Sequence, residues 1–167
     1  VIKGATGLMT GSGAPSATVN LVRKKPTKEF KASVSATAGY WDNYRTEGDI
    51  SGSLNDSGSV RGRFVGALQD KDSYIDHYSQ KKDLFYGVLE ADLTDDTLLT
   101  LGVDKSSATP RGSSWTGNAP YFTDGGRTDF SRSFNPGADW SRRDFDSVTY
   151  FSSLEQALAN DWKFKAS

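Results

Sequence analysis

The residue types that most often carry enzyme chemistry are sparse in this sequence. It holds one histidine, His77, and no cysteine, so disulfides and thiol-based metal sites are excluded. His77 stands in a polar stretch without a recognisable partner, and we expect a loop residue rather than a metal ligand or general base. Serines are many, but no nucleophile elbow or triad pattern accompanies them. We therefore expect no enzymatic activity.

Glycines and charged pairs admit functional interpretations that their spacing does not support. The glycine-rich stretch Gly4–Gly13 lacks the GxxxxGK[ST] spacing of a nucleotide loop, so we expect structural turns. Asp95-Asp96 and Arg142–Asp144 are expected to be solvated charges of turns and loops. The formal net charge of -1 gives no electrostatic case for nucleic-acid binding.

Aromatic side chains are the remaining candidates for binding. Phe, Trp and Tyr make up 12% of the chain, and several lie in the non-periodic stretch Ser106–Asp144, among them Trp115, Tyr121 and Trp140. Rings that line a pocket could stack on a bulky, amphipathic ligand. The alternative is an aromatic girdle at a membrane interface. The residues that suit a girdle best are Tyr40, Tyr44 and Trp162.

The elements that would hold these rings are β-strands, because apolar and polar residues alternate from Phe30 onward. The predicted strands are Phe30–Ala38, Tyr44–Leu54, Val60–Asp70, Leu84–Leu93, Leu99–Asp104, Ser147–Leu158 and a last one that begins at Trp162. The predicted tight turns are Tyr40–Asn43, Asn55–Gly58, Thr94–Asp96 and Ala159–Asp161. Two long loops are predicted, at Lys71–Lys82 and Ser106–Asp144.

Loop lengths distinguish two architectures. The turns Asn55–Gly58, Thr94–Asp96 and Ala159–Asp161 fall at every second connection, and the connections between them vary more, with Tyr40–Asn43 short and two long ones. This parity is typical of transmembrane barrels, and strands of about 9–11 residues suit a tilted crossing. A soluble β-sandwich could share the composition, with 35% hydrophobic residues and a mean hydropathy of -0.58, but it would not explain this parity. In the favoured barrel, the lipid-facing residues are Phe64, Leu68, Phe85, Leu89, Leu101 and Leu154. The lumen-facing residues are Arg61, Arg63, Glu90, Asp92 and Glu155.

The stretch before Phe30 has a different character. From Gly4 to Val22 there is no charged side chain, but its glycines and Pro15 argue against a membrane helix. We predict a turn-rich piece, one short strand at Thr18–Val22 and a basic cluster at Arg23–Lys25. The chain opens at Val1 rather than Met and shows no signal peptide, and we expect an internal piece of a longer protein.

The run VIKGATGLMTGSGAPSATVNLVRKKPT (Val1–Thr27) resembles the closing segment of the plug domain of TonB-dependent outer-membrane siderophore receptors. Its form is most similar to receptors for ferric pyoverdine (pseudobactin) and hydroxamates such as coprogen. The stretches RGRFV, LEADLTDDTLLTLGV and DWSRRDFDS follow in the order expected of that family. Many relatives carry Gly-Gly near Ser16–Ala17, where this chain departs from the pattern.

The resemblance implies an all-β fold: an antiparallel transmembrane barrel of about 22 strands closed around an N-terminal plug. Residues 1–27 would be the end of the plug, and residues 28–167 the first seven or so barrel strands. Arg23–Lys25 would pair with lumen carboxylates such as Glu47, Asp49 or Glu155.

The implied function is uptake of a ferric siderophore, with ferripyoverdine the first candidate, across the outer membrane of a Gram-negative bacterium. TonB would supply the energy through a segment absent from this chain, and outer-membrane lipid would surround the barrel. Iron would be cargo, so no cofactor and no protein metal ligands are expected. Trp115, Tyr121 and Trp140 would contact the siderophore. The alternative is a secreted or periplasmic all-β binding or adhesion module.

Overall fold

The computed structural model describes residues 2–3, 17–18, 21–114, 117–160 and 162–167. Within these ranges every regular element is a β-strand, which confirms the predicted all-β class. Two short strands, β1 (Ile2–Lys3) and β2 (Ala17–Thr18), pair antiparallel. None of the described segments forms a helix long and apolar enough to cross a membrane.

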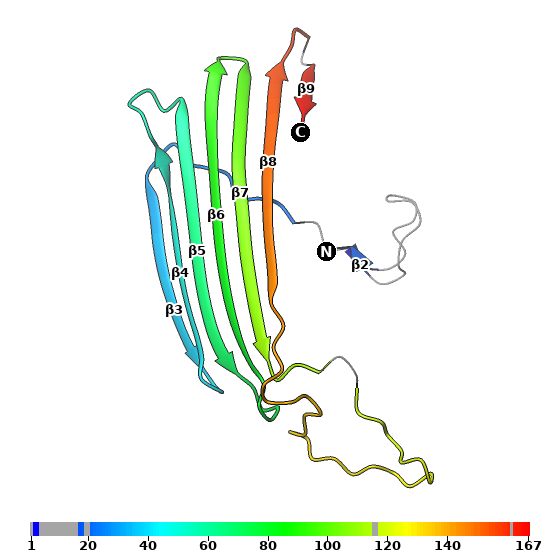
Figure 1. Ribbon diagram of the computed structural model, residues 1–167. Helices are drawn as coiled ribbons and strands as arrows, with labels where there is room; N and C mark the ends of the chain where they lie inside the picture. The colour runs from blue at the N-terminus through cyan, green and yellow to red at the C-terminus, as the bar shows by residue number, and fades with distance from the viewer. Residues whose placement is uncertain (1, 4–16, 19–20, 115–116, 161) are drawn as a thin grey trace.

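The main body is one seven-stranded sheet in the order β3-β4-β5-β6-β7-β8-β9, and each strand is antiparallel to the next in sequence. The strands are β3 (Lys31–Gly39), β4 (Asn43–Ser53), β5 (Val60–Asp72), β6 (Ser79–Thr94), β7 (Thr97–Arg111), β8 (Phe145–Ala157) and β9 (Lys163–Ala166). Figure 1 shows them as one curved layer with no second sheet stacked on it. This is the strand-to-neighbour order of an up-and-down barrel wall.

The connections gather at two ends of the sheet (Figure 1). We call the end with the connections 54–59, 95–96 and 158–162 the turn end, and the end with 40–42, 73–78 and 112–144 the loop end. The predicted tight turns at Tyr40–Asn43, Asn55–Gly58 and Thr94–Asp96 are confirmed, whereas Ala159–Asp161 includes residue 161, which lies outside the described residues. Of the two predicted long loops, the second is found, at 112–144. The first, predicted at Lys71–Lys82, is a short connection of residues 73–78.

The prediction of a loop at Lys71–Lys82 was wrong because β5 continues to Asp72 and β6 begins at Ser79. Similarly, β7 runs on to Arg111, well past the last apolar alternation. At the loop end both faces of the strands are polar, so alternation disappears from the sequence. The backbone ladder nevertheless persists, with Asp72 opposite Ser79 and Ser79 opposite Arg111.

The predicted strand Thr18–Val22 is found only in part. β2 ends at Thr18, Leu21 and Val22 lie outside any strand, and residues 19–20 fall outside the described part of the chain. After Val22 the chain crosses one face of the main sheet before it enters β3 (Figure 1). We call residues 23–28 the docked segment, the face they contact the inner face, and the opposite face the outer face.

The outer face is apolar and uncovered. The register places Phe64, Leu89 and Leu101 on this face, with exposed fractions of 44%, 42% and 47%. It also places Leu68, Phe85 and Leu154 there, so all six residues predicted to face lipid share one face. An uncovered apolar face of this extent is expected of a sheet that meets lipid or another apolar surface.

The inner face carries the buried side chains and most of the buried charge. Val65, Ala67 and Val88 are buried there, and so are Ser51, Arg61 and Glu90. The five residues predicted to face the lumen, Arg61, Arg63, Glu90, Asp92 and Glu155, all lie on this face. The predicted alternation of faces is therefore confirmed on both sides of the sheet.

Candidate functional site

Asp49 is the centre of the contact between the docked segment and the sheet. Its carboxylate accepts two hydrogen bonds from Arg63, at 2.9 and 2.7 Å, and a third from Lys24 Nζ at 2.8 Å. Only 10% of the Asp49 side chain is exposed. A bidentate arginine pair with a second cation on the same carboxylate is among the stronger arrangements in proteins, because the donors are charged and the geometry is fixed.

The backbone of the docked segment is also held by side chains of the inner face. Tyr86 donates its hydroxyl hydrogen to the Lys24 carbonyl at 2.6 Å, and Arg63 Nη1 donates to the Lys25 carbonyl at 3.0 Å. The Thr27 amide donates to Ser51 Oγ at 2.8 Å. These backbone groups have no strand partner, so the side chains of the sheet supply the hydrogen bonds that a covered chain requires.

Arg23 fixes the first residue of the docked segment through an aromatic pair. Its guanidinium carbon lies 4.2 Å from the centre of the Phe151 ring, which stacks on Tyr86 at 6.2 Å. Arg23 also pairs with Asp104 at 3.6 Å. Gly102 lies directly opposite Phe151 in the ladder, and a Cβ there would collide with the Phe151 ring, so glycine allows the ring to lie flat on the sheet.

The predicted pairing of Arg23–Lys25 with inner-face carboxylates is confirmed for Asp49. The other two carboxylates offered for this pairing, Glu47 and Glu155, form ion pairs with Arg45 and Lys165. The sequence reasoning missed Asp104, Tyr86 and Phe151. The sequence did contain a signal for the last two. Tyr86 and Phe151 are aromatic residues at positions of β6 and β8 that otherwise belong to the polar face, and an aromatic ring on a polar face indicates that another part of the protein covers it.

A second charged cluster lies at the turn end of the inner face. Arg61 makes two hydrogen bonds to Asp92, at 2.6 and 2.8 Å, one to the Gly58 carbonyl, and an ion pair with Glu90 at 3.6 Å. Arg61 therefore ties the 54–59 connection to β6. Glu90 Oε1 is buried and accepts no hydrogen bond from the described residues.

At the loop end, the long connection 112–144 packs on the connection 73–78. The Asp76 amide donates to the Ser133 carbonyl at 2.8 Å, and Asn135 Nδ2 donates to the carbonyls of Asp76 and Gly112 at 2.8 and 2.6 Å. Gly112 has a φ of 62°, and a Cβ there would collide with the His77 carbonyl. His77 is thus a loop residue, as predicted, and the long connection is anchored at its base.

The three predicted siderophore contacts all belong to the 112–144 connection, and the structure describes two of them. Tyr121 forms a bridge with Arg127 and is 62% exposed, and Trp140 is 84% exposed. No ring contact joins Tyr121 to Trp140. Trp115 lies outside the described residues. These three residues therefore remain predictions.

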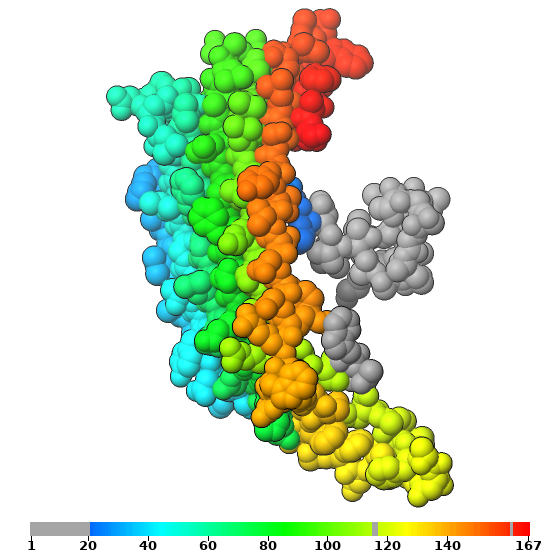
Figure 2. All heavy atoms as spheres, in the orientation of Figure 1, coloured from blue at the N-terminus to red at the C-terminus, as the bar shows by residue number. Residues whose placement is uncertain are grey.

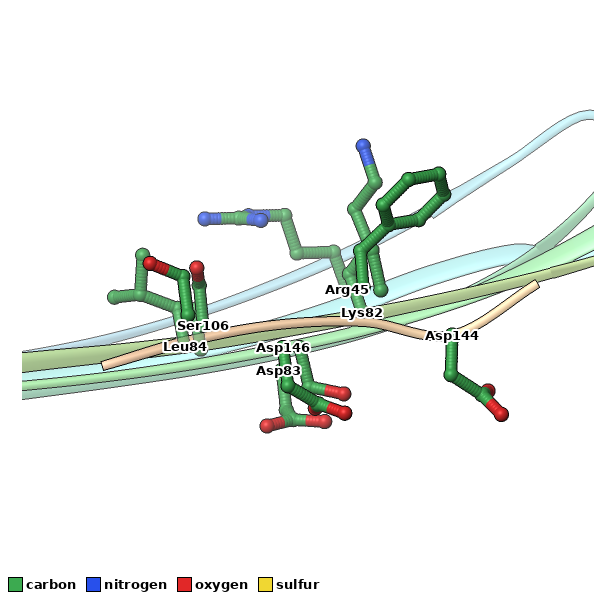
Figure 3. A pocket seen from close by; sticks show the side chains of 12 residues that line it. Arg45, Lys82, Asp83, Leu84, Ser106, Asp144 and Asp146 are labelled. Carbon is green, nitrogen blue, oxygen red and sulfur yellow. The ribbon is translucent and has the colours of Figure 1, made fainter.

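A cavity of about 640 Å³ lies beside the loop end of β6, β7 and β8. Figure 3 shows Arg45, Lys82 and Ser106 projecting from one side of the sheet and Asp83, Asp144 and Asp146 from the other. The register identifies the first side as the inner face. The hydrogen bond from Arg142, supported by one from Thr109, holds the pKa of the Asp144 carboxyl below its ordinary value.

Within the described part of the chain, no group of His, Cys, Asp or Glu residues is arranged to hold a metal ion. The charges of the inner face are instead engaged mainly in ion pairs with arginine and lysine.

Comparison with known proteins gives a consistent result. No family model matches the chain. The ferripyoverdine receptor of Pseudomonas aeruginosa is 55% identical over 97% of this chain, and the match covers 20% of that protein. The crystal structure of the ferripyoverdine receptor of the outer membrane of that organism, bound to ferripyoverdine, superposes on 98% of this chain and 22% of its own with a TM-score of 0.90 and 54% identity. The alcaligin outer-membrane receptor FauA of Bordetella pertussis covers 98% of this chain and 23% of its own with a TM-score of 0.72 and 38% identity.

The chain is homologous to a segment of the ferripyoverdine receptors. This confirms the resemblance that the residues of Val1–Thr27 indicated. The chain spans about a fifth of the length of the ferripyoverdine receptors that it matches. The antiparallel sheet of β3–β9, seen as the long continuous slab in Figure 2, thus corresponds to part of the fold of a ferripyoverdine receptor.

Proposed function

We propose that this chain is part of an outer-membrane receptor that captures a ferric siderophore of the pyoverdine type and admits it to the periplasm with energy from TonB. The observation that carries the proposal is the docked segment on a sheet whose other face is apolar and uncovered. A barrel wall that meets lipid outside and a plug inside requires this arrangement. The 55% identity to a ferripyoverdine receptor supports the same conclusion.

The proposed domain division follows from the same arrangement. Residues 1–27 form the end of the plug, and residues 28–167 the first seven or so strands of the barrel. The change of character at Pro26 and Thr27 supports this boundary, because Thr27 is the last residue whose side chain bonds to Ser51 before the chain turns into β3.

The proposed mechanism is binding followed by movement of the plug, without a covalent step. Iron travels as cargo inside the siderophore, so the protein supplies neither a cofactor nor iron ligands. The homologues are receptors rather than enzymes. Trp115, Tyr121 and Trp140 are proposed to stack on the siderophore. Their place in the anchored 112–144 connection and the exposure of Trp140 support this role.

Uptake of ⁵⁵Fe-labelled ferripyoverdine tests the proposal. Cells that carry the complete gene should accumulate the label, and deletion of the gene or of tonB should abolish accumulation. Replacing Trp140 by Ala should weaken binding to these cells by about tenfold, whereas replacing the outer-face Tyr150 by Ala should not. A gene product found in the periplasm or medium, with unchanged iron uptake after deletion, would identify the binding or adhesion module instead.

A further inference from the structure

A row of residues on the inner face lies between the docked segment and the loop end. In the ladder, Arg45 is opposite Gln69, Gln69 opposite Lys82, Lys82 opposite Ala108, and Ala108 opposite Phe145. We call the contact between the docked segment and the inner face, centred on Asp49, the seam. The row is two residues along β4 from Glu47 and four from Asp49, so it is close to the seam but lies outside it. A ligand that enters from the loop end meets this row before it reaches the docked segment.

The two neighbouring lysines in this region face opposite ways. Lys81 belongs to the outer face and pairs with Asp70 at 2.9 Å. Lys82 belongs to the inner face and forms no ion pair with any residue in the described part of the chain. The carboxylates that line the cavity, Asp83, Asp144 and Asp146, project from the other side of the sheet (Figure 3).

The surroundings of Lys82 add a second positive charge and apolar surface. Arg45 projects from the same side of the sheet, and its partner Glu47 leaves 42% of the Arg45 side chain exposed. Phe145 is 50% exposed and Leu84 is 43% exposed, both on the inner face of the same cavity. A cation beside exposed rings and aliphatic groups fits a ligand that is anionic at one end and apolar at another.

We infer that Lys82, assisted by Arg45, binds an anionic group of the ferric siderophore, while Phe145 and Leu84 contact its apolar part. This inference rests on the proposed function. Siderophores hold Fe(III) through anionic oxygens, and negative charge in excess of that of the metal is recognised by a fixed cation. The inner face offers Lys82 for this purpose because, unlike Lys24 and Arg63, it is not engaged by the seam.

The complete receptor allows a matched test. Lys82→Gln should raise the Kd for ferripyoverdine by about tenfold, since the loss of a charge-assisted contact corresponds to that factor. Lys82→Glu should raise it further, and the dependence of Kd on salt should fall in both variants. Lys81→Gln, which differs by one position but faces outward, should leave the Kd within about twofold of the unmodified receptor.

Titration calorimetry on receptor purified in detergent measures each Kd, and Lys82→Arg checks that the charge rather than the fold is responsible. Retention of tight binding by Lys82→Arg together with the loss in Lys82→Gln supports the inference. An unchanged Kd in both Lys82→Gln and Lys82→Glu overturns it and leaves the proposed function intact. Failure of the unmodified receptor to bind any ferric siderophore would instead overturn the proposed function and the inference with it.

Discussion

The two faces of the β3–β9 sheet are built from alternate residues of the same strands, yet they meet opposite environments. On the outer face, Val34 and Tyr150 are 83% and 80% exposed. On the inner face, Arg61 and Glu90 are 7% and 5% exposed. A water-soluble domain distributes these residue types the other way round. The comparison teaches that the apolar face is left open for an apolar surrounding, which is lipid in the proposed barrel, whereas the charged face is covered by the chain's own residues 23–28.

The faces also differ in what stabilises them. The outer face gains from transfer of apolar side chains out of water, which depends on area and not on direction. The inner face depends on directed contacts, of which the bonds to Asp49 are the densest. We therefore expect the loss of stability from a substitution on the outer face to depend on its depth in the proposed membrane. On the inner face it should depend on which hydrogen-bonding and charged partners the substitution leaves unpaired.

The largest expected effect comes from placing a charge on the outer face. Leu89→Arg in the complete receptor should cost about 2–4 kcal/mol of folding free energy, because Leu89 lies within the apolar band. Thr46→Arg, on the same face near the loop end, should cost about 0–1 kcal/mol. Urea unfolding in lipid vesicles measures both values, and equal costs at the two depths would contradict a lipid-facing apolar band on the outer face.

Removal of the central carboxylate of the seam should have the next largest effect. Asp49→Asn leaves Arg63 and Lys24 without their shared partner, and we expect a loss of about 2 kcal/mol, less than for a fully buried pair. Glu47→Gln breaks only an exposed pair with Arg45 and should cost at most about 0.5 kcal/mol. Protease sensitivity of residues 1–27, measured beside unfolding, should rise in Asp49→Asn alone. The same sensitivity in both variants would contradict a special role for Asp49.

The smallest effect is expected from a single hydroxyl. Tyr86→Phe removes the hydrogen bond to the Lys24 carbonyl but keeps the ring on Phe151, and should cost about 1 kcal/mol. The control is Tyr150→Phe on the outer face, which removes a hydroxyl without a described partner and should be close to neutral. If the unfolding curves of Tyr86→Phe and Tyr150→Phe coincide, the stability of the seam does not depend on this hydrogen bond.

Much of the fold could be predicted because alternation reports the environment of a face. The prediction of a strand from Val60 is confirmed, and the opposite faces of Phe64 and Arg63 follow from the alternation, although β5 runs two residues past the predicted end, to Asp72. Where both faces of a strand meet water, both carry polar residues, so the alternation that marks a strand disappears from the sequence. The continuation of β6 back to Ser79, which gives Lys82 its inward direction, was missed for that reason.

The candidate site was less predictable, because its parts come from separate strands. Asp49 could be proposed as a partner of the basic cluster on charge alone, but nothing near Arg23 in the sequence indicates Asp104 or Phe151. The aromatic residues of the 112–144 connection could be proposed only from their loop position, since a loop has no period from which a direction can be read.

Taken alone, the sequence determined the strand period, the all-β class and which residues share a face, because these depend on local side-chain chemistry along one strand. The tertiary structure alone decided which charges are engaged by the docked segment and which, such as Lys82, are left for a ligand. That choice depends on the register between strands and on the path of residues 23–28 across them, and both are set by contacts between residues far apart in the chain.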